Sequence, residues 1–433
     1  MWKKTLKSLL AMSLTASLVL LSASCSGSGN EDLITSEGTT GEKTKIVFFR
    51  CGTEELKTEA FKKMLDAFEE KYPNITVEYQ DAPWGDDLET KLNTGYASGT
   101  APDVINNALA SIGLRVGLGQ YGALDEYVTE ETGLDDFYES AIEAGSLNGK
   151  LYGIATFADA RMFMYNKDLF EKAGLDPNKT PSSWEELKEY HEKLIVKDDS
   201  GNVIQTGFSF PTSGHGLEQW LMIFGMQNGV PSLLDDETNE ILFTRPETVE
   251  AMEFLSELNE MGGIMWDSTK TDTNPFASGK SAMTINSENE FHSFNVGDLE
   301  GKLAMAPMFS NKEDGTFCGM HFMFMNAQSK HKDEAWKLIE HLTSEEMLKV
   351  WCDTLGTTPL RKSMRDDYMA SNPNGELILK SVETGKGLPR VPYSATMSSI
   401  LVDAMEKVYY GEAEPKAALE EAAVKVQAEI DNQ

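Results

Sequence analysis

The stretch LYGIATFADARMFMYNKDLFEKAGLDPNKTPSSWEEL, residues 151–187, decides the fold. It begins with a short apolar run typical of a buried strand and then passes through a loop that carries Phe157, Asp159 and Arg161. A second apolar run follows, and a short helix after it ends at Gly174, because glycine is common just past a helix end. This alternation of strands and helices predicts that the chain leaves one α/β unit here and enters another.

A βαβ unit precedes this stretch. Residues 46–49 are strand formers, apolar residues recur at helical spacing over 60–72, and 75–79 alternate as a strand does. The pattern predicts a parallel sheet with helices on its faces. Ligands of such sheets bind at the carboxyl ends of the strands, which is where the loop 50–55 would lie.

Two parts of this unit are candidate ligand contacts. Arg50, Thr53 and Glu54 belong to the loop that follows the first strand, although Thr53 and Glu54 can equally cap the next helix. Trp84 follows the second strand and is either a stacking platform for a ligand or a core residue.

Length and composition limit the class of protein. At 433 residues the chain is long for one core, so we expect two domains. A hydrophobic fraction of 40% and a charged fraction of 25% are those of a soluble globular protein. The net charge of −32 repels phosphate backbones and anionic lipid head groups. We therefore expect no nucleic-acid partner, and any membrane attachment has to be covalent or inserted.

The four cysteines do not form a disulfide framework or a zinc site. No CxxC spacing occurs, so we expect no metal. If Cys25 is modified, Cys51, Cys318 and Cys352 remain, and at least one of them is free unless it bridges two molecules. Cys51 in a strand and Cys352 in a helical pattern are typical of buried small hydrophobic residues.

The first residues are typical of a secretory leader. A basic start and an apolar core too short to span a bilayer precede Ser22-Ala23-Ser24-Cys25. Small residues before a cysteine resemble the bacterial lipobox, whose cysteine is diacylated and becomes the mature N-terminus. We expect a signal peptide over 1–24 and a lipid-anchored flexible tether over 25–44, the alternative being an ordinary leader cleaved nearby.

Residues 151–187 also resemble the "LYGIP…LYYNKDLFEKAGL-P-TWEEL" signature of family 1 extracellular solute-binding proteins, the ligand receptors of sugar-type ABC importers. Three further segments match patterns of that family. Residues 101–104 resemble A/G-P-D-[VI], 276–285 resemble F-x-x-G-K-A-A-M, and 319–336 resemble the G-G…S-K-x-K-E-A-W segment. Residues 356–361 match G-x-x-P-x-R, so the resemblance extends over the whole mature chain.

The resemblance implies the fold. It is an α/β, two-lobed periplasmic-binding-protein-like fold of type II, with a ligand cleft between the lobes and a hinge of crossing strands. We expect those strands near 152–156, 303–308 and 355–360. The expected boundaries of the lobes are 45–154 and 306–357 for lobe I, and 155–305 and 358–433 for lobe II.

The resemblance also places loops at the cleft. Asn106 and Asn107 follow the strand at 104, where relatives often have an aromatic residue, and Glu288 and Asn289 lie where relatives often have Trp. His215 in a Gly-rich loop is either a ligand contact or a surface residue. The candidate ligand-binding residues are Arg50, Thr53, Glu54, Trp84, Asn106, Asn107, Phe157, Asp159, Arg161, His215, Glu288, Asn289 and Tyr393.

The implied function is capture of a carbohydrate-like ligand by hinge closure and delivery to an ABC importer permease. We expect no cofactor, a monomer, and anchoring to the outer face of the bacterial cytoplasmic membrane. No catalytic motif occurs: G-x-S-x-G, H-E-x-x-H, the Walker loop and the dinucleotide fingerprint are all missing from the sequence. The alternatives are a lipid-anchored glycan hydrolase and a sensory receptor of the same fold.

Overall fold

The computed structural model describes residues 43–433, and Cys25, the leader and most of the tether lie outside them. The strands are β1 (Thr44–Cys51), β2 (Ile75–Ala82), β3 (Val104–Ala108), β4 (Ser146–Leu147), β5 (Lys150–Leu151), β6 (Gly153–Asn166), β7 (Val196–Lys197), β8 (Val203–Ser209), β9 (Ser281–Ser287), β10 (Leu303–Ala306) and β11 (Cys318–Met325). The α-helices are α1 (Glu55–Lys71), α2 (Asp86–Ser98), α3 (Ser111–Gly117), α4 (Glu139–Ala144), α5 (Lys167–Lys172), α6 (Trp184–Leu194), α7 (Leu217–Gln227), α8 (Pro246–Gly262), α9 (Glu288–Phe294), α10 (Lys332–Leu342), α11 (Glu345–Leu355), α12 (Arg365–Ser371), α13 (Gly375–Thr384), α14 (Ser394–Tyr409) and α15 (Pro415–Asp431).

The main sheet has two halves that share β6. Its strand order is β2-β1-β3-β11-β6-β9-β8-β7, with β10 also paired to β6. We call the half with β2, β1, β3 and β11, together with its helices, the first lobe, and the half with β9, β8 and β7 the second lobe. The pairs β1–β2 and β1–β3 are parallel, which confirms the predicted βαβ unit.

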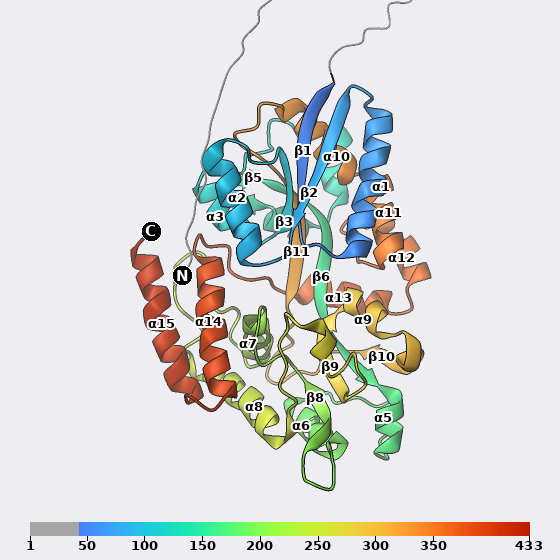
Figure 1. The fold of residues 1–433 in the computed structure, drawn as a ribbon, viewed down its shortest axis with the longest axis vertical. Helices are drawn as coiled ribbons and strands as arrows, with labels where there is room; N and C mark the ends of the chain where they lie inside the picture. Colours follow the sequence, from blue (N-terminus) through green and yellow to red (C-terminus); the bar gives the residue numbers. More distant parts are fainter. Residues whose placement is uncertain (1–42) are drawn as a thin grey trace, which may run out of the picture. The chain divides into compact units, whose positions relative to one another are not determined.

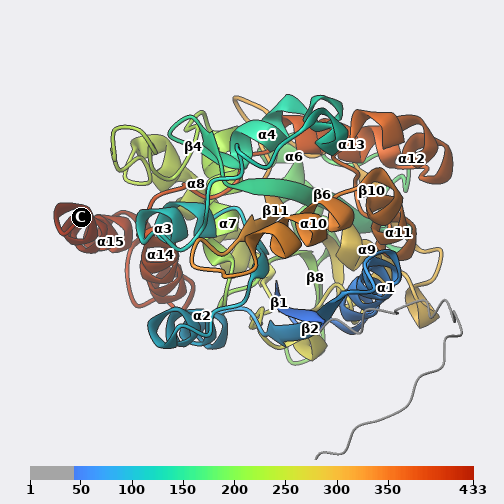
Figure 2. The ribbon, with the colours of Figure 1, turned by 90° about the horizontal axis from the view of Figure 1, so that it is seen from above.

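Helices cover both faces of the first lobe's sheet. The ring centroid of Phe48 in β1 lies 5.1 Å from that of Phe61 in α1, whereas the ring of its neighbour Phe49 lies 5.0 Å from Nζ of Lys91 in α2. Because successive side chains of a strand point to opposite faces, α1 and α2 lie on opposite sides of β1, as Figures 1 and 2 show.

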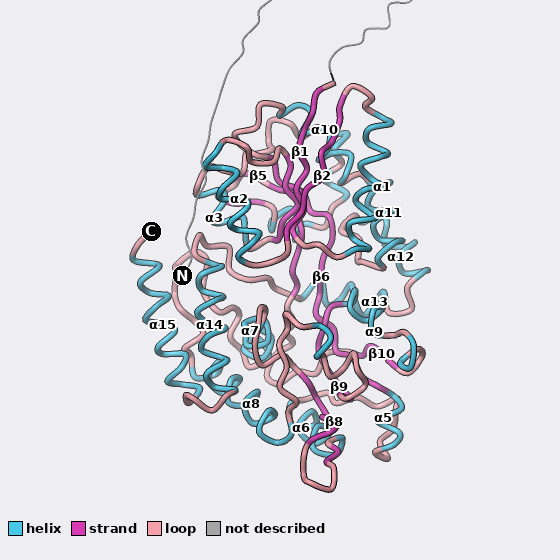
Figure 3. The backbone as a smooth tube through the Cα atoms, in the orientation of Figure 1, coloured by secondary structure: helices cyan, strands magenta, loops and turns pink. Residues whose placement is uncertain are grey.

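The expected loop at 157–161 is wrong. β6 is one strand of 14 residues that runs without a break through both halves of the sheet (Figure 3). Residues 153–160 pair with β11, and from Arg161 onward the strand pairs with β9 instead. The exchange of partners therefore falls at Ala160–Arg161, later than the crossing that we expected near 152–156. Polar side chains in this stretch suggested a loop. Pairing with β11 up to Ala160 and with β9 from Arg161 onward keeps it extended.

Two buried clusters of hydrophobic side chains form the core. In the second half of β6, Met162 and Met164 belong to the first cluster, whereas Phe163 and Tyr165 belong to the second. The strand's period of two thus delivers side chains to both clusters. The first cluster also contains side chains from 360–382, which we had assigned to lobe II; the sequence-based lobe boundaries stay a prediction.

Local signals set the helix ends as the sequence predicted. The Asn166 side chain accepts a hydrogen bond from the Leu169 N–H at the start of α5, and Gly174 follows this helix with φ +75°. The Ser183 hydroxyl accepts from the Glu186 N–H in the same way at the start of α6.

Two further expectations concern cysteines and membranes. Cys51 and Cys318 are buried, Cys352 is half-buried in α11, and all three are free thiols in the structure. None of the helices in 43–433 is both long and apolar enough to span a bilayer.

Candidate functional site

The first group of polar side chains lies where β1 ends and α1 begins. Arg50 is 1% exposed, and its guanidinium donates to the Glu54 carboxylate, to the Glu54 carbonyl at 3.3 Å and to Thr58 Oγ1 at 2.9 Å. The Lys57 ammonium lies 3.3 Å from the other carboxylate oxygen of Glu54. Burial raises the pKa of Glu54, but Lys57 and Arg50 outweigh burial and hold the pKa below its usual value. Both cations of this group therefore already have a carboxylate partner.

Gly52 permits this close packing. Its φ is +93°, and a Cβ on it would lie 2.5 Å from Glu54 Oε2 and 2.7 Å from Trp84 Nε1. Any other residue would be strained there and would push these two side chains apart. Trp84 is 40% exposed beside this group, which favours a platform over a core position.

The second group comes from β6 and α7. Arg161 Nη1 donates to Asp159 Oδ2 at 3.1 Å, and its Nε and Nη2 donate to Gln219 Oε1 at 3.2 and 2.8 Å. The guanidinium also lies 5.4 Å from the ring centroid of Phe317. Asp159 Oδ1 is buried and has no hydrogen-bond partner within 43–433. The guanidinium of Arg161 thus already has partners, whereas one buried carboxylate oxygen of Asp159 has none within 43–433.

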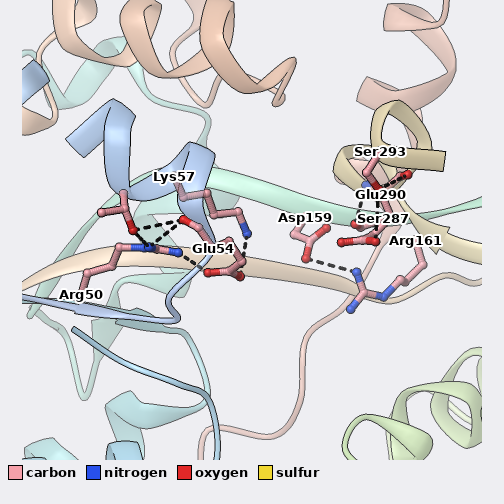
Figure 4. Close-up of polar contacts among 9 residues, drawn as sticks. Arg50, Glu54, Lys57, Asp159, Arg161, Ser287, Glu290 and Ser293 are labelled. Carbon is pink, nitrogen blue, oxygen red and sulfur yellow. Dashed lines mark hydrogen bonds and ion pairs between the residues drawn. The ribbon is translucent and has the colours of Figure 1, made fainter. Parts of the chain in front are cut away.

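Glu290 in the first turn of α9 adds a second carboxylate. Its N–H donates to the Ser287 hydroxyl at 3.3 Å, and its carboxylate takes part in no ion pair among the described residues. Much of the side chain is accessible to solvent, yet burial among surrounding atoms raises its pKa, which Lys57 opposes. Figure 4 shows Glu54 and Lys57 on one side and Asp159, Arg161 and Glu290 on the other, with a space between the two groups. We call this space the gap.

Aromatic rings lie beside these charged groups. The His321 imidazole of β11 stacks on Phe157 of β6 with centroids 4.3 Å apart, and Trp84 contacts its edge at 5.5 Å. Phe157 in turn stacks on Trp351 of α11 at 5.1 Å. Burial and then Lys57 lower the pKa of His321 to about 3, and its Nδ1 has no hydrogen-bond partner in the described part of the chain. The ring is therefore uncharged at neutral pH.

The structure brings six of the predicted site residues together around the gap. They are Arg50, Glu54, Trp84, Phe157, Asp159 and Arg161. Thr53 is exposed at the start of α1. The side chain of Asn289 is not described, so the prediction for it lies outside the described residues, as does that for Cys25.

The remaining predicted residues have other partners. Asn106 and Asn107 are buried, and their amides donate to the Phe322 carbonyl and the Tyr121 hydroxyl. Tyr393 is buried and its hydroxyl donates to Asn239 Oδ1 at 2.6 Å. His215 is exposed. A Cβ added at Gly85 would lie 3.0 Å from the His215 Nε2, so the imidazole lies against the loop before α2.

Glu288 is buried and fully hydrogen-bonded, so its carboxylate is not accessible to a ligand. It is 1% exposed, and its carboxylate accepts from the Thr358 N–H at 2.7 Å and from the Thr358 hydroxyl at 3.0 and 2.8 Å. Burial raises its pKa to about 8, Thr358 opposes this, and the nearby charge of Asp159 adds to it. Its position ties α9 to the segment that follows α11.

The candidate residues drawn from the sequence did not include Lys57, Gln219, Glu290 and His321, although the resemblance to the family allowed His321 to reach the cleft. Lys57 follows Glu54 by three residues, a spacing that places the two on one face of a helix start. His321 and Phe157 are directly paired across β11 and β6, and this register is not visible in the sequence. Gln219 and Glu290 each lie in the first turn of a helix after a predicted loop.

A surface hollow of about 440 Å³ lies elsewhere, on the second lobe near α5 and α9. Two of its polar side chains already have partners: Asn166 caps α5, and the Asp168 carboxylate lies 3.7 Å from the Lys302 ammonium. Within 43–433 no group of three or more His, Cys, Asp or Glu side chains is arranged to hold a metal ion.

Residues 63–375 match the family model of the bacterial extracellular solute-binding proteins, and the chain belongs to this family. It is therefore a solute-binding protein. A chain from Brucella abortus (strain 2308), whose name gives only a binding role, is 28% identical over 382 residues, covering 85% of this chain and 89% of that one. The sn-glycerol-3-phosphate-binding periplasmic protein UgpB of Shigella flexneri is 25% identical over 401 residues, covering 83% and 87%.

Solved structures share the fold. An ABC transporter solute-binding protein from Thermotoga lettingae TMO, bound with α-D-tagatose, superposes with a TM-score of 0.78 at 24% identity, covering 89% of this chain and 99% of that one. This likeness confirms the predicted two-lobed α/β fold.

Proposed function

We propose that this chain captures a carbohydrate-like ligand in the gap between its two lobes and delivers it to an ABC importer permease. The observation that carries the proposal is the gap itself, where charged side chains of both lobes face each other beside the stacked rings of Phe157 and His321. Hydrogen-bonding groups next to aromatic planes suit a sugar, which has hydroxyls on its edge and apolar faces. The family membership and the α-D-tagatose in a structural neighbour support this ligand class.

Closure of the hinge completes the site. A ligand that touches both lobes only when they are shut shifts the population toward the closed form. A micromolar dissociation constant corresponds to a binding free energy of about −8 kcal/mol. A handful of hydrogen bonds and one stacked ring supply this after the free-energy cost of closing the lobes has been subtracted. The closed form would then dock on the permease.

The anchor and the lobe boundaries belong to the same proposal. A diacylated Cys25 would hold the monomer on the outer face of the cytoplasmic membrane through the tether 25–44, with lobe I formed by 45–154 and 306–357 and lobe II by 155–305 and 358–433. The periplasmic location of the relative UgpB and the extracellular character of the family support an extracytoplasmic site. Mass spectrometry of the purified full chain checks the acylation of Cys25, because an unmodified N-terminal peptide would contradict it.

A thermal-shift screen tests ligand capture, since a ligand that binds the native state raises the melting temperature. The panel contains α-D-tagatose, maltose, ribitol, mannobiose and glycerol. We expect at least one of them to raise the melting temperature of the wild type, and Asp159→Ala and Arg161→Ala to reduce that shift without unfolding the chain. Unchanged shifts in both variants would remove this part of β6 from the site.

We also propose that the chain has no catalytic activity of its own. Incubation with maltose and mannobiose, followed by chromatography, should show binding without product. Release of monosaccharide would instead support a lipid-anchored glycan hydrolase.

A further inference from the structure

The charged groups of the gap are balanced. It holds three cations, which are Arg50, Lys57 and Arg161. It also holds three carboxylates, which are Glu54, Asp159 and Glu290. Each guanidinium is already bonded to an acid near it, Arg50 to Glu54 and Arg161 to Asp159. A phosphate or a carboxylate on a ligand would therefore have to displace a protein carboxylate from its arginine before it gained a charge-assisted hydrogen bond.

His321 and Asp159 each have a buried polar atom without a hydrogen-bond partner among the described residues, and His321 is the uncharged one of the two. Its ring is fixed by the stack on Phe157 and the edge contact with Trp84, and Nδ1 is buried without a hydrogen bond in the described residues. An uncharged imidazole carries one donor and one acceptor, and buried polar groups of native proteins are almost always paired. The imidazole therefore still has room for one hydrogen-bond partner.

We propose that His321 is a specificity-determining residue that offers an uncharged imidazole to a ligand hydroxyl, and that it makes the gap reject phosphorylated and acidic sugars. This inference rests on the proposed function. It narrows the ligand class from carbohydrate-like compounds to those that are uncharged where they meet β11.

Two effects act against an anion. Protonating His321 to receive it is unfavourable by roughly 10⁴-fold at pH 7, because the pKa of this ring is about 3. Without that proton, an anion would meet the carboxylate of Glu290, which has no cationic partner among the described residues, and the negative charge of Asp159, whose buried Oδ1 has no hydrogen-bond donor there. The net charge of −32 on the whole chain adds a general repulsion.

Matched pairs of probes test the rejection of anions. The pairs are D-tagatose with D-tagatose 6-phosphate and glycerol with sn-glycerol 3-phosphate, measured by calorimetry on the full chain. We expect the phosphorylated member to bind at least tenfold more weakly than its uncharged partner. A phosphorylated probe that binds as tightly as its partner, or more tightly, overturns the inference.

A ring variant tests the role of His321. His321→Phe keeps a flat ring between Phe157 and Trp84 but removes both nitrogens, and we expect at least a tenfold loss of affinity for the uncharged probe that binds best. His331→Phe is the matched control, because the His331 ring makes no hydrogen bond or ring contact within 43–433. Equal affinity of His321→Phe and the wild type for that probe overturns the inference.

Two further measurements distinguish a role of His321 in ligand selection from a purely structural role. Titration of the ¹⁵N-labelled imidazoles by nuclear magnetic resonance should show His321 uncharged down to about pH 4, whereas titration near its ordinary value of 6.5 overturns the inference. Asp159→Asn frees one arginine, and we expect it to improve the binding of sn-glycerol 3-phosphate at least tenfold. If no uncharged probe binds the wild type, the proposed function fails and this inference fails with it. Retained affinity in His321→Phe defeats the inference alone.

Discussion

Two glutamates of α9 that lie two residues apart have opposite environments. Glu288 is sealed against Thr358, whereas Glu290 faces the gap and has no ion-pair partner among the described residues. Successive residues of a helix turn by about 100°, so positions i and i+2 point to opposite sides of a helix. The same residue type therefore holds the fold together at one position and is free to meet a ligand at the other.

The largest effect is expected at the sealed position. Glu288→Ala leaves the buried Thr358 N–H without an acceptor and takes the carboxylate away from the Thr358 hydroxyl, and we expect the free energy of unfolding to fall by about 3 kcal/mol. Urea denaturation measures this change. Glu288→Gln is the control, since it keeps the volume and one acceptor and should lose less. A loss of under about 1 kcal/mol in the alanine variant would remove the contrast with Glu290.

The pH dependence of stability gives the next effect. The pKa of Glu288 is about 8 in the folded protein, above the ordinary value of 4.5. Between these values the folded state holds a proton that the unfolded state lacks, so stability falls as pH rises from about 4.5 to about 8, by at most about 1.4 kcal/mol per pH unit. Above pH 8 this contribution is lost and the dependence ends.

Glu288→Gln has no such proton. The difference in unfolding free energy between the wild type and this variant should therefore decline with pH across that window. Parallel pH profiles for the two proteins would show that the Glu288 carboxyl titrates normally.

A smaller effect is expected at the cap that orients both glutamates. The Ser287 hydroxyl accepts a hydrogen bond from the Glu290 N–H at the start of α9. Ser287→Ala removes this cap and should lower the free energy of unfolding by about 1 kcal/mol. Ser293→Ala, in the last turn of the same helix, serves as a comparison and should lose less. If both serine variants lose the same amount, the cap does not set the start of α9.

The smallest effect on stability is expected at the open position. Glu290→Gln should change the free energy of unfolding by less than about 0.5 kcal/mol, as is usual for an accessible side chain. Its effect should instead appear in calorimetry, as a weaker rejection of sn-glycerol 3-phosphate. A variant that is markedly destabilised would place Glu290 in the same class as Glu288.

Much of the fold could be predicted because its signals are local. The βαβ unit of β1, α1 and β2 follows from periodicity, and the ends of α5 follow from Asn166 and Gly174. The continuity of β6 could not be predicted, because Asp159 lies in a strand only through its pairing with Gly319, which is far away in the sequence. The family motifs identified the architecture where periodicity could not.

The candidate site was predicted in part for the same reason. Arg50 and Glu54 lie at the end of a recognisable strand, as the rule for parallel sheets requires. His321 depends on the register of two distant strands, and the choice between Glu288 and Glu290 depends on where α9 begins. These two facts belong to tertiary structure, so the sequence named the right segments but not every side chain.

The unbroken course of β6 has a thermodynamic consequence. Residues 153–160 of this one strand pair with β11 and residues 161–166 pair with β9 and β10, so β6 is the strand that joins the two halves of the sheet. Heating should accordingly melt residues 43–433 in one cooperative step, with calorimetric and van't Hoff enthalpies that agree. The hinge closure that we propose would then twist an intact strand instead of separating two bodies on a loose linker.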